Sequence, residues 1–210
     1  MPAIDQLVSG FKVFKARYYE HRPELYENLR TLGQNPEVMV VACSDSRVDP
    51  AILLGSEPGE LFVIRNVANL IPPYQPDGKL HGTSAALEFG IRDLKVKHLI
   101  VLGHSGCGGI EALRRCCSGD PLREREFIGP WVSLGMRACE AVPAEGRGGG
   151  DNGAIERAAI EISLENIATF PWVADGIAQG SLSIHGWWFD LQKGALWGYD
   201  AKTKAFAKMV

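Results

Sequence analysis

Two short motifs contain the residues of this sequence that are best suited to chemistry. The first is Cys43-Ser44-Asp45-Ser46-Arg47, and the second begins at His104 and reads HSGCGG, which places a cysteine at Cys107. Two thiolates and one imidazole form a ligand set typical of zinc, and catalytic zinc sites use three protein ligands with a fourth position open. Taken singly, a buried cysteine or a structural histidine is the simpler interpretation. Together, the motifs predict a zinc site at Cys43, His104 and Cys107.

Asp45 and Arg47 add a second feature to the first motif. In the simpler interpretation, Asp45 caps the following helix and Arg47 is a surface base. In the functional interpretation, the arginine keeps the carboxylate ionised, so that Asp45 can only accept a hydrogen bond from a zinc-bound hydroxide. Asp45 could instead bind zinc directly and close the site. Because Zn²⁺ with two thiolates is formally neutral, we expect activity to rise from neutral into alkaline pH.

Both motifs follow directly after apolar runs that predict buried strands of a parallel sheet. Three such runs occur, at 37–43, 61–69 and 98–104, and helical patterns cover 82–95 and about 109–116, with a helix start near Asp49. Strands that alternate with helices predict an α/β fold with a mostly parallel central sheet and flanking helices. Functional groups collect at the carboxyl ends of such strands. We therefore expect the two motifs to meet if their strands are neighbours.

The two ends of the chain complete the expected architecture of a single domain over 1–210. Apolar residues at helical spacing predict a helix from residue 3 to about 20 and another from near Pro23 to Leu32, which Gly33 ends. This N-terminal helical arm (1–35) packs either on the chain's own core or on a partner subunit. Residues 154–169 read as a helix, 130–142 as helical, 145–153 as a flexible loop, and 182–200 as an antiparallel edge hairpin around Lys193–Gly194.

Composition excludes several classes of protein. The 210 residues are 46% hydrophobic and 22% charged, which excludes a disordered chain. The formal net charge of −3 argues against nucleic acid and anionic membranes as main partners. No apolar run approaches the length of a membrane span, and the N-terminus lacks the layout of a signal peptide, so we expect a cytoplasmic location. An odd number of cysteines then predicts free thiols or metal ligands rather than a disulfide framework, with Cys116, Cys117 and Cys139 packing on helices.

Four ordered blocks resemble the signatures of the β-class carbonic anhydrases. They read VACSDSRV, GELFVIRNVANLIPPY, GTSAALEFG and VLGHSGCGGI, and the likeness spans about residues 30–115. The resemblance implies zinc on Cys43, His104 and Cys107, with Asp45 and Arg47 as the catalytic dyad. It also implies reversible hydration of CO₂ to bicarbonate and a proton by zinc-bound hydroxide.

The resemblance further implies a small apolar pocket and an oligomer. Phe62, Val67 and Phe89 would line the pocket, while Gln34 and the backbone N–H of Gly108 would offer hydrogen bonds to the substrate. Part of this lining comes from a neighbouring subunit in the family, which implies a homodimer or a tetramer, with the N-terminal helices as the arm that wraps the partner.

The subtype follows from three further positions. Some bacterial members of the family bind regulatory bicarbonate through a tryptophan, an arginine and a tyrosine; here these positions are Val40, Arg65 and Phe189, so that the arginine alone is retained. Together with Gln34, this resembles the plant-like subgroup with an open zinc site. We expect an open site at neutral pH and no bicarbonate inhibition of that kind.

Two other functions remain open. One is a zinc hydrolase of carbonyl sulfide or carbon disulfide, since relatives of this fold act on such linear molecules. The other is a non-catalytic protein whose zinc is closed by Asp45 and purely structural, although a structural site does not need Arg47 to draw the fourth ligand away. Among the remaining histidines, His81 is a possible proton relay, whereas His21, His98 and His185 are expected to be solvated or structural.

Overall fold

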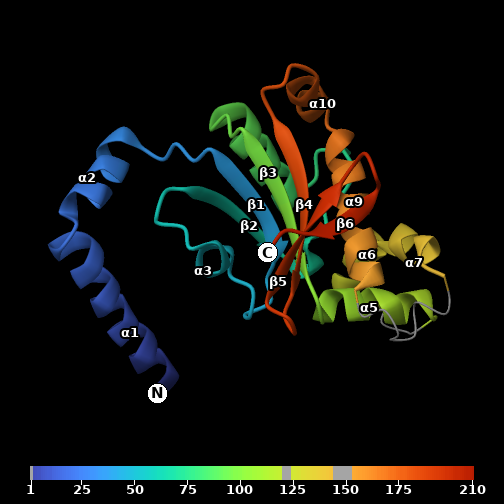
Figure 1. Cartoon of the computed structure of the whole chain (residues 1–210), viewed down its shortest axis with the longest axis horizontal. Helices are drawn as coiled ribbons and strands as arrows, with labels where there is room; N and C mark the ends of the chain where they lie inside the picture. Colours follow the sequence, from blue (N-terminus) through green and yellow to red (C-terminus); the bar gives the residue numbers. More distant parts are fainter. Residues whose placement is uncertain (1, 120–123, 144–152) are drawn as a thin grey trace. The chain divides into compact units, whose positions relative to one another are not determined.

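A computed structural model describes residues 2–119, 124–143 and 153–210 (Figure 1). The chain divides into two compact units, Met1–Asn35 and Pro36–Val210. The first unit coincides with the segment predicted as the N-terminal helical arm. It contains helix α1 (Pro2–Lys15), the π-helical turn η1 (Ala16–Glu20) and helix α2 (Pro23–Leu32).

The N-terminal unit is held together by aromatic rings. The rings of Phe14 and Tyr26 lie edge to face with their centroids 5.6 Å apart, and Tyr19 stacks on Tyr26 at 4.8 Å. Pro23 occupies the first turn of α2, and Gly33 follows its last residue with a φ of 77°, as the sequence predicts. Helix α1 has no buried residue within this chain, and Phe11 keeps 62% of its surface exposed.

The second unit is built on a six-stranded sheet in the order β2-β1-β3-β4-β5-β6. The first four strands in this order run parallel, and the last two pair antiparallel. This confirms the mostly parallel sheet with a C-terminal antiparallel hairpin. The strands are β1 (Val38–Cys43), β2 (Leu61–Asn66), β3 (His98–His104), β4 (Ser183–Asp190), β5 (Ala195–Asp200) and β6 (Ala205–Lys208).

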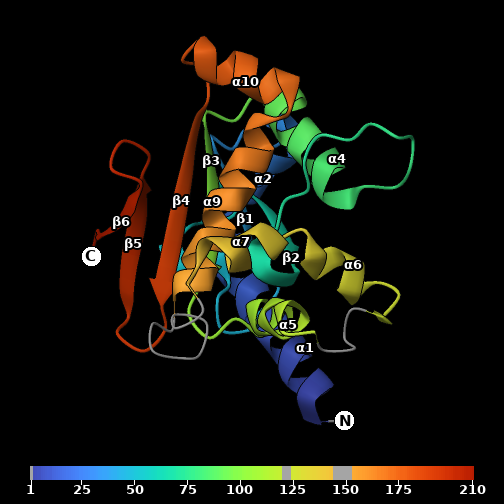
Figure 2. The ribbon, with the colours of Figure 1, turned by 90° about the vertical axis from the view of Figure 1, so that its right-hand side faces the viewer.

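Helices cover the sheet because alternate strand residues point to opposite faces. Met39, Val41 and Leu99 form one core with residues of α9 (Ala154–Ala168), and Figure 2 shows α9, α7 (Met136–Ala141) and α5 (Gly108–Cys117) on that side. Val40 and Ile100 form another core, against which residues of α3 pack. The helical segments are α3 (Pro50–Leu54), η2 (Val67–Asn69), α4 (Gly82–Glu88), η3 (Phe89–Asp93), α5 (Gly108–Cys117), α6 (Ile128–Ser133), α7 (Met136–Ala141), α9 (Ala154–Ala168) and α10 (Pro171–Ala178).

Some element boundaries differ from the prediction. The run at 61–69 leaves the sheet after Asn66, because Ala68 and Asn69 take positive φ angles of 65° and 48°. The segment 130–142 forms two helices rather than one, and they separate at Gly135, whose added Cβ would lie 2.7 Å from Leu113. The loop expected at 145–153 falls outside the described residues, apart from Gly153.

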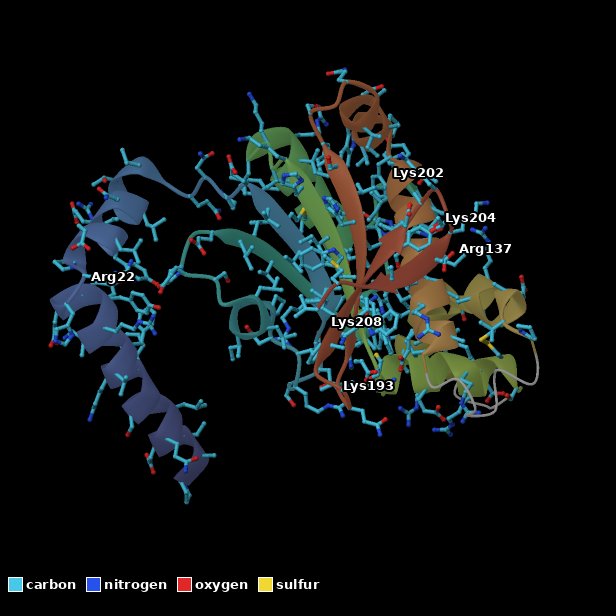
Figure 3. The ribbon with its side chains drawn as sticks, viewed as in Figure 1. Arg22, Arg137, Lys193, Lys202, Lys204 and Lys208 are labelled. Atoms are coloured by element: carbon cyan, nitrogen blue, oxygen red, sulfur yellow. A yellow bond between two sulfur atoms is a disulfide. The ribbon has the colours of Figure 1, made fainter. Side chains whose placement is uncertain are left out.

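Two elements were not predicted. Helix α10 begins at Pro171, directly after α9, and its Val173 is fully buried. Strand β6 has only four residues and carries lysine at its end, so it shows too little alternation to be recognised. Its Phe206 packs on Tyr199 of β5 at 5.3 Å between ring centroids. Figure 3 shows Lys202 and Lys204 in the turn that joins β5 to β6.

The prediction of free thiols is wrong for two cysteines. Cys117, at the end of α5, forms a disulfide with Cys139 in α7, with the two Cα atoms 6.5 Å apart. Helices α5 and α7 pack side by side, which brings together two residues whose spacing in the sequence carries no such signal. Cys43, Cys107 and Cys116 are free and buried. Within the described segments, no helix is both long and apolar enough to cross a membrane.

Candidate metal centre

The two motifs meet because their strands are parallel neighbours. Strands β1 and β3 pair in parallel from Val38 opposite His98, so both end at the same edge of the sheet (Figure 1). Cys43 is the last residue of β1, His104 is the last residue of β3, and Cys107 precedes the first turn of α5. The ligand atoms of these three buried residues all lie within 4.8 Å of one another.

The distances and the donor atoms fit a zinc ion. The Sγ atoms of Cys43 and Cys107 are 3.7 Å apart, and two sulfurs bonded to one tetrahedral zinc lie about 3.8 Å apart, given a Zn–S bond of about 2.3 Å. The Nδ1 atom of His104 is 3.0 Å from the carbonyl oxygen of Ser105, which can only accept, so Nδ1 carries the proton. Nε2 therefore presents its lone pair, and this buried atom has no hydrogen-bond partner in the part of the chain described.

The two thiols are unequal in acidity. The pKa of Cys43 is lowered chiefly by a hydrogen bond from Cys107, and also by the neighbouring His104 and by backbone N–H groups. One of these is the N–H of Ala68, 3.4 Å from the Cys43 sulfur. The Cys43 thiolate and burial together raise the pKa of Cys107. A bound divalent cation would displace the proton that the two sulfurs share, so metal binding releases protons.

Asp45 and Arg47 form a paired carboxylate and guanidinium beside the three ligands. Arg47 donates from Nε to Oδ1 at 2.9 Å and from an Nη atom to Oδ2 at 2.7 Å, and its backbone N–H also reaches Oδ1 at 3.0 Å. These bonds hold the pKa of Asp45 well below its usual range. Oδ2 lies 3.9 Å from Nε2 of His104. The helix-cap interpretation of Asp45 is wrong, because Asp49 caps α3.

Arg65 of β2 supports the first motif through hydrogen bonds, a role that the sequence analysis did not predict. Its guanidinium donates to the carbonyl oxygens of Cys43 at 3.1 Å and Asp45 at 2.7 Å, and to the Asp49 carboxylate at 2.8 Å. The segment from Cys43 to Asp49 is therefore anchored at three points. The available signal was a charged residue directly after the apolar run Leu61–Ile64 of strand β2.

A close approach at Gly109 joins the second motif to η2. A Cβ at Gly109 would lie 2.6 Å from a methyl carbon of Val67 and 2.8 Å from the Cβ of Ala68. Only glycine therefore lets the first turn of α5 pack on the residues that face Cys43. On the other side, the indole N–H of Trp131 donates to the carbonyl oxygen of Val67 at 2.8 Å, a contact that the sequence did not suggest.

The residues expected to line the substrate pocket are placed as follows. Phe62 and Phe89 are neighbours, with ring centroids 5.9 Å apart. Val67 is 38% exposed and lies against Gly109, and Gly108 begins α5. Gln34 belongs to the N-terminal unit. Of the positions related to the regulatory site, Val40 is fully buried, and Phe189 pairs with His104 across β3 and β4.

Comparisons with known proteins agree with this geometry. The carbonic anhydrase family model matches residues 38–196. Beta carbonic anhydrase 5, chloroplastic, of Arabidopsis thaliana is 40% identical over 189 residues, which cover 89% of this chain and 61% of that protein. Beta carbonic anhydrase 3 of the same plant is 36% identical over 219 residues, covering 99% and 82%. The chain thus spans less than two thirds of the first relative and most of the second.

Solved structures of β-carbonic anhydrases are also similar to this chain. The β-carbonic anhydrase CcaA has a TM-score of 0.85 and 30% identity, with 100% of this chain and 93% of that chain covered. The β-carbonic anhydrase CafA of Aspergillus fumigatus has a TM-score of 0.79 and 29% identity, with 95% and 91% covered. With these likenesses along most of its length and a zinc ligand set at the ends of β1 and β3, the chain belongs to the β-class carbonic anhydrases.

Proposed function

We propose that this protein catalyses the reversible hydration of CO₂ to bicarbonate and a proton, with zinc held by Cys43, His104 and Cys107. One observation carries the proposal: three ligand atoms within 4.8 Å of one another lie beside an ionised Asp45 that is bonded to Arg47 rather than free. Zinc, when bound, would act as a Lewis acid and supply the nucleophile, to an increasing extent as the pH rises from neutral into the alkaline range.

Asp45 and Arg47 have distinct roles in this proposal. An ionised carboxylate can only accept hydrogen bonds, so Oδ2 of Asp45 would accept a hydrogen bond from the attacking hydroxyl group. This bond would orient the lone pair of the hydroxyl oxygen toward the carbon of CO₂. Arg47 fixes the carboxylate through both oxygens and also donates to the carbonyl oxygen of Gly106 at 2.9 Å. The same bonds keep Asp45 from acting as a fourth ligand, which favours an open catalytic site over a closed structural one.

The substrate site is proposed from the apolar residues that the family resemblance assigns to it. Phe62 lies opposite Met39, four positions before the level of Cys43 and Asn66, so Phe62 and its neighbour Phe89 are proposed as the part of the lining that a neighbouring subunit supplies. CO₂ is uncharged and non-polar, so Phe62, Val67 and Phe89 suit it, and the backbone N–H of Gly108 would offer the substrate a hydrogen bond. The hydrogen bond expected from Gln34, which belongs to the N-terminal unit, stays a prediction. No residue in the set adds a charge that would hold bicarbonate in place after the reaction.

A homodimer or tetramer is the proposed assembly. Helix α1 carries exposed apolar side chains, among them Leu7 at 70% exposed, which suits contact with a second copy. A solved structure from work on two tetrameric β-carbonic anhydrases of Sordaria macrospora has a TM-score of 0.74 and 25% identity to this chain. The cytoplasm remains the proposed location, although one relative is named chloroplastic.

Stopped-flow CO₂ hydration, with zinc counted in each sample, tests the function on the wild type and on Asp45→Ala and Cys43→Ala. We expect a zinc-loaded, active wild type, an Asp45→Ala variant that keeps most zinc but loses most of the rate, and a Cys43→Ala variant without either. A wild type that holds zinc without hydrating CO₂ would reject the proposal. Sulfide release from carbonyl sulfide or carbon disulfide by such a protein would identify the hydrolase instead.

A further inference from the structure

A buried carboxylate lies behind the second zinc-ligand motif. Glu156, in the first turn of α9, has only 8% of its surface exposed. Its Oε1 accepts a hydrogen bond from the backbone N–H of Cys107 at 3.3 Å, and its Oε2 accepts one from the indole N–H of Trp188 at 3.0 Å. A charged side chain is costly to bury, and these N–H groups offset part of that cost.

The two partners of Glu156 require a carboxylate. Both are N–H groups, which can only donate, and a carboxylate is the one common side chain of this shape with an acceptor on each oxygen. A glutamine would present one acceptor and one donor, so its NH₂ group would face either the N–H of Cys107 or that of Trp188. The geometry therefore distinguishes glutamate from its nearest isostere.

Trp188 gives Glu156 a rigid support. The indole is 6% exposed, the guanidinium of Arg157 lies 5.0 Å from its ring centroid, and Trp197 contacts it edge to face at 6.4 Å between centroids. Trp188 also belongs to β4 and lies opposite Gly103 of β3, next to the ligand His104. Glu156 thus connects a fixed point of the sheet to the backbone of Cys107.

The loop that carries Cys107 needs such a support. Cys107 stands between Gly106, whose φ is 66°, and Gly108, which begins α5. Glycines restrain the backbone less than any other residue, so little within the loop itself fixes the direction of the Cys107 side chain. A hydrogen bond to the backbone N–H of the ligand supplies the missing restraint.

We propose that Glu156, anchored by Trp188, is a positioning residue that holds the zinc ligand Cys107 in its binding geometry. This rests on the proposed zinc site, and it assigns a role to a residue outside both motifs. Outer partners of metal ligands typically contribute about 10- to 100-fold to metal affinity, and we expect an effect of that size here.

The test measures metal binding directly, by zinc competition with a chromogenic chelator and by the absorption spectrum of the cobalt(II)-substituted protein. Glu156→Gln should bind zinc about 10- to 100-fold more weakly and should change the cobalt–thiolate and ligand-field bands. The control is Glu165→Gln on the same helix, because the exposed Glu165 carboxylate accepts a hydrogen bond from Arg137 at 2.8 Å and forms no hydrogen bond or ion pair with either motif among the described residues. This control should match the wild type in both measurements.

A second substitution separates hydrogen bonding from general damage. In E156Q the NH₂ group of the glutamine would face the indole N–H of Trp188, and two donors cannot bond to each other. Trp188→Phe removes this indole N–H, so the variant that combines E156Q with W188F should bind zinc more tightly than E156Q alone. Should E156Q not fold, E156A and E156Q are compared in the W188F background, where alanine, which has no acceptor, should bind zinc about 10-fold more weakly or worse.

Zinc affinity and cobalt spectra of E156Q that match those of E165Q would overturn the proposal, as would a double variant no better than E156Q. Neither measurement depends on turnover. A wild type that binds zinc but does not hydrate CO₂ would therefore reject the proposed activity. The role of Glu156 would still be decided by the zinc affinity and the cobalt spectrum of E156Q.

Discussion

The sulfur atoms of Cys43 and Cys107 lie 3.7 Å apart, although 64 positions separate the two residues in the sequence. This separation matches the edge of a zinc tetrahedron, about 3.8 Å. It arises from the sheet, because the parallel strands β1 and β3 deliver both motifs to one edge. The ligand geometry is therefore a property of the fold as well as of the motifs.

Replacement of either cysteine ligand should abolish zinc binding. In Cys43→Ala and Cys107→Ala two ligands remain, too few for a stable zinc site, so we expect no bound zinc by elemental analysis and no measurable hydration. Cys116→Ala is the matched control, because Cys116 is equally buried and free but is not a ligand. It should keep zinc and lose about 1 kcal/mol of unfolding free energy. Equal zinc content in all three variants would contradict the assignment.

Replacement of Asp45 should lower the rate without moving its pH dependence. Arg47 depresses the pKa of Asp45, so the carboxylate is ionised from mildly acid to alkaline pH, and its protonation cannot produce a transition there. Asp45→Asn should reduce kcat by about 100- to 1000-fold while the midpoint of the pH–rate curve stays in place. Glu111→Gln, which removes an exposed ion pair with Arg114 on α5, serves as the control. A shifted midpoint in D45N would refute this account.

Reduction of the Cys117–Cys139 disulfide should destabilise the protein. The bridge spans 22 positions, and closure of a loop of that length contributes about 3 kcal/mol in the chain-entropy model. We expect dithiothreitol to lower the Tm by roughly 6–12 °C. Cys117→Ser should reproduce the loss and make the Tm insensitive to reductant. Alkylation of the unfolded, unreduced protein should count three free thiols; five would show that the bridge does not form.

His185 should make the fold sensitive to mild acid. Burial lowers its pKa, and the nearby charge of His98 lowers it further; the two ring nitrogens are 3.4 Å apart. A group whose pKa is lowered by folding contributes stability that is complete above its unfolded pKa, about 6.5, and is lost as the pH falls through the folded pKa.

Unfolding midpoints in denaturant, measured from pH 8 to pH 5, check this expectation. His185→Gln should flatten the decline below about pH 6.5, and His98→Gln should flatten it in part. His21→Gln, in the exposed turn between the N-terminal helices, should leave the decline unchanged. An undiminished decline in His185→Gln would assign the acid sensitivity to other groups.

The local patterns sufficed for much of the fold. Three apolar runs indicated β1, β2 and β3, and the positions of both motifs after their strands predicted the convergence of Cys43, His104 and Cys107. This succeeded because parallel-sheet geometry is general: the carboxyl ends of neighbouring strands share one edge.

Other features depend on contacts that no local pattern encodes. Glu156 and Trp188 are distant from both motifs in the sequence and reach Cys107 only through the packing of α9 on the sheet. The disulfide depends on the approach of α5 to α7, and β6 depends on its pairing with β5. In each case the contact joins segments that only the folded structure brings together, so the sequence around each residue does not indicate its partner.

The placement of Cys43 and His104 as the final residues of paired strands limits how this chain can vary in length. A single-residue insertion or deletion within Val38–Cys43 or His98–His104 would rotate the terminal side chain to the opposite face of the sheet. Changes of length in the exposed residues 73–80 between η2 and α4, outside the sheet, leave both orientations intact. Evolution of this protein is therefore free to lengthen the surface connection but must preserve the residue count of the two strands.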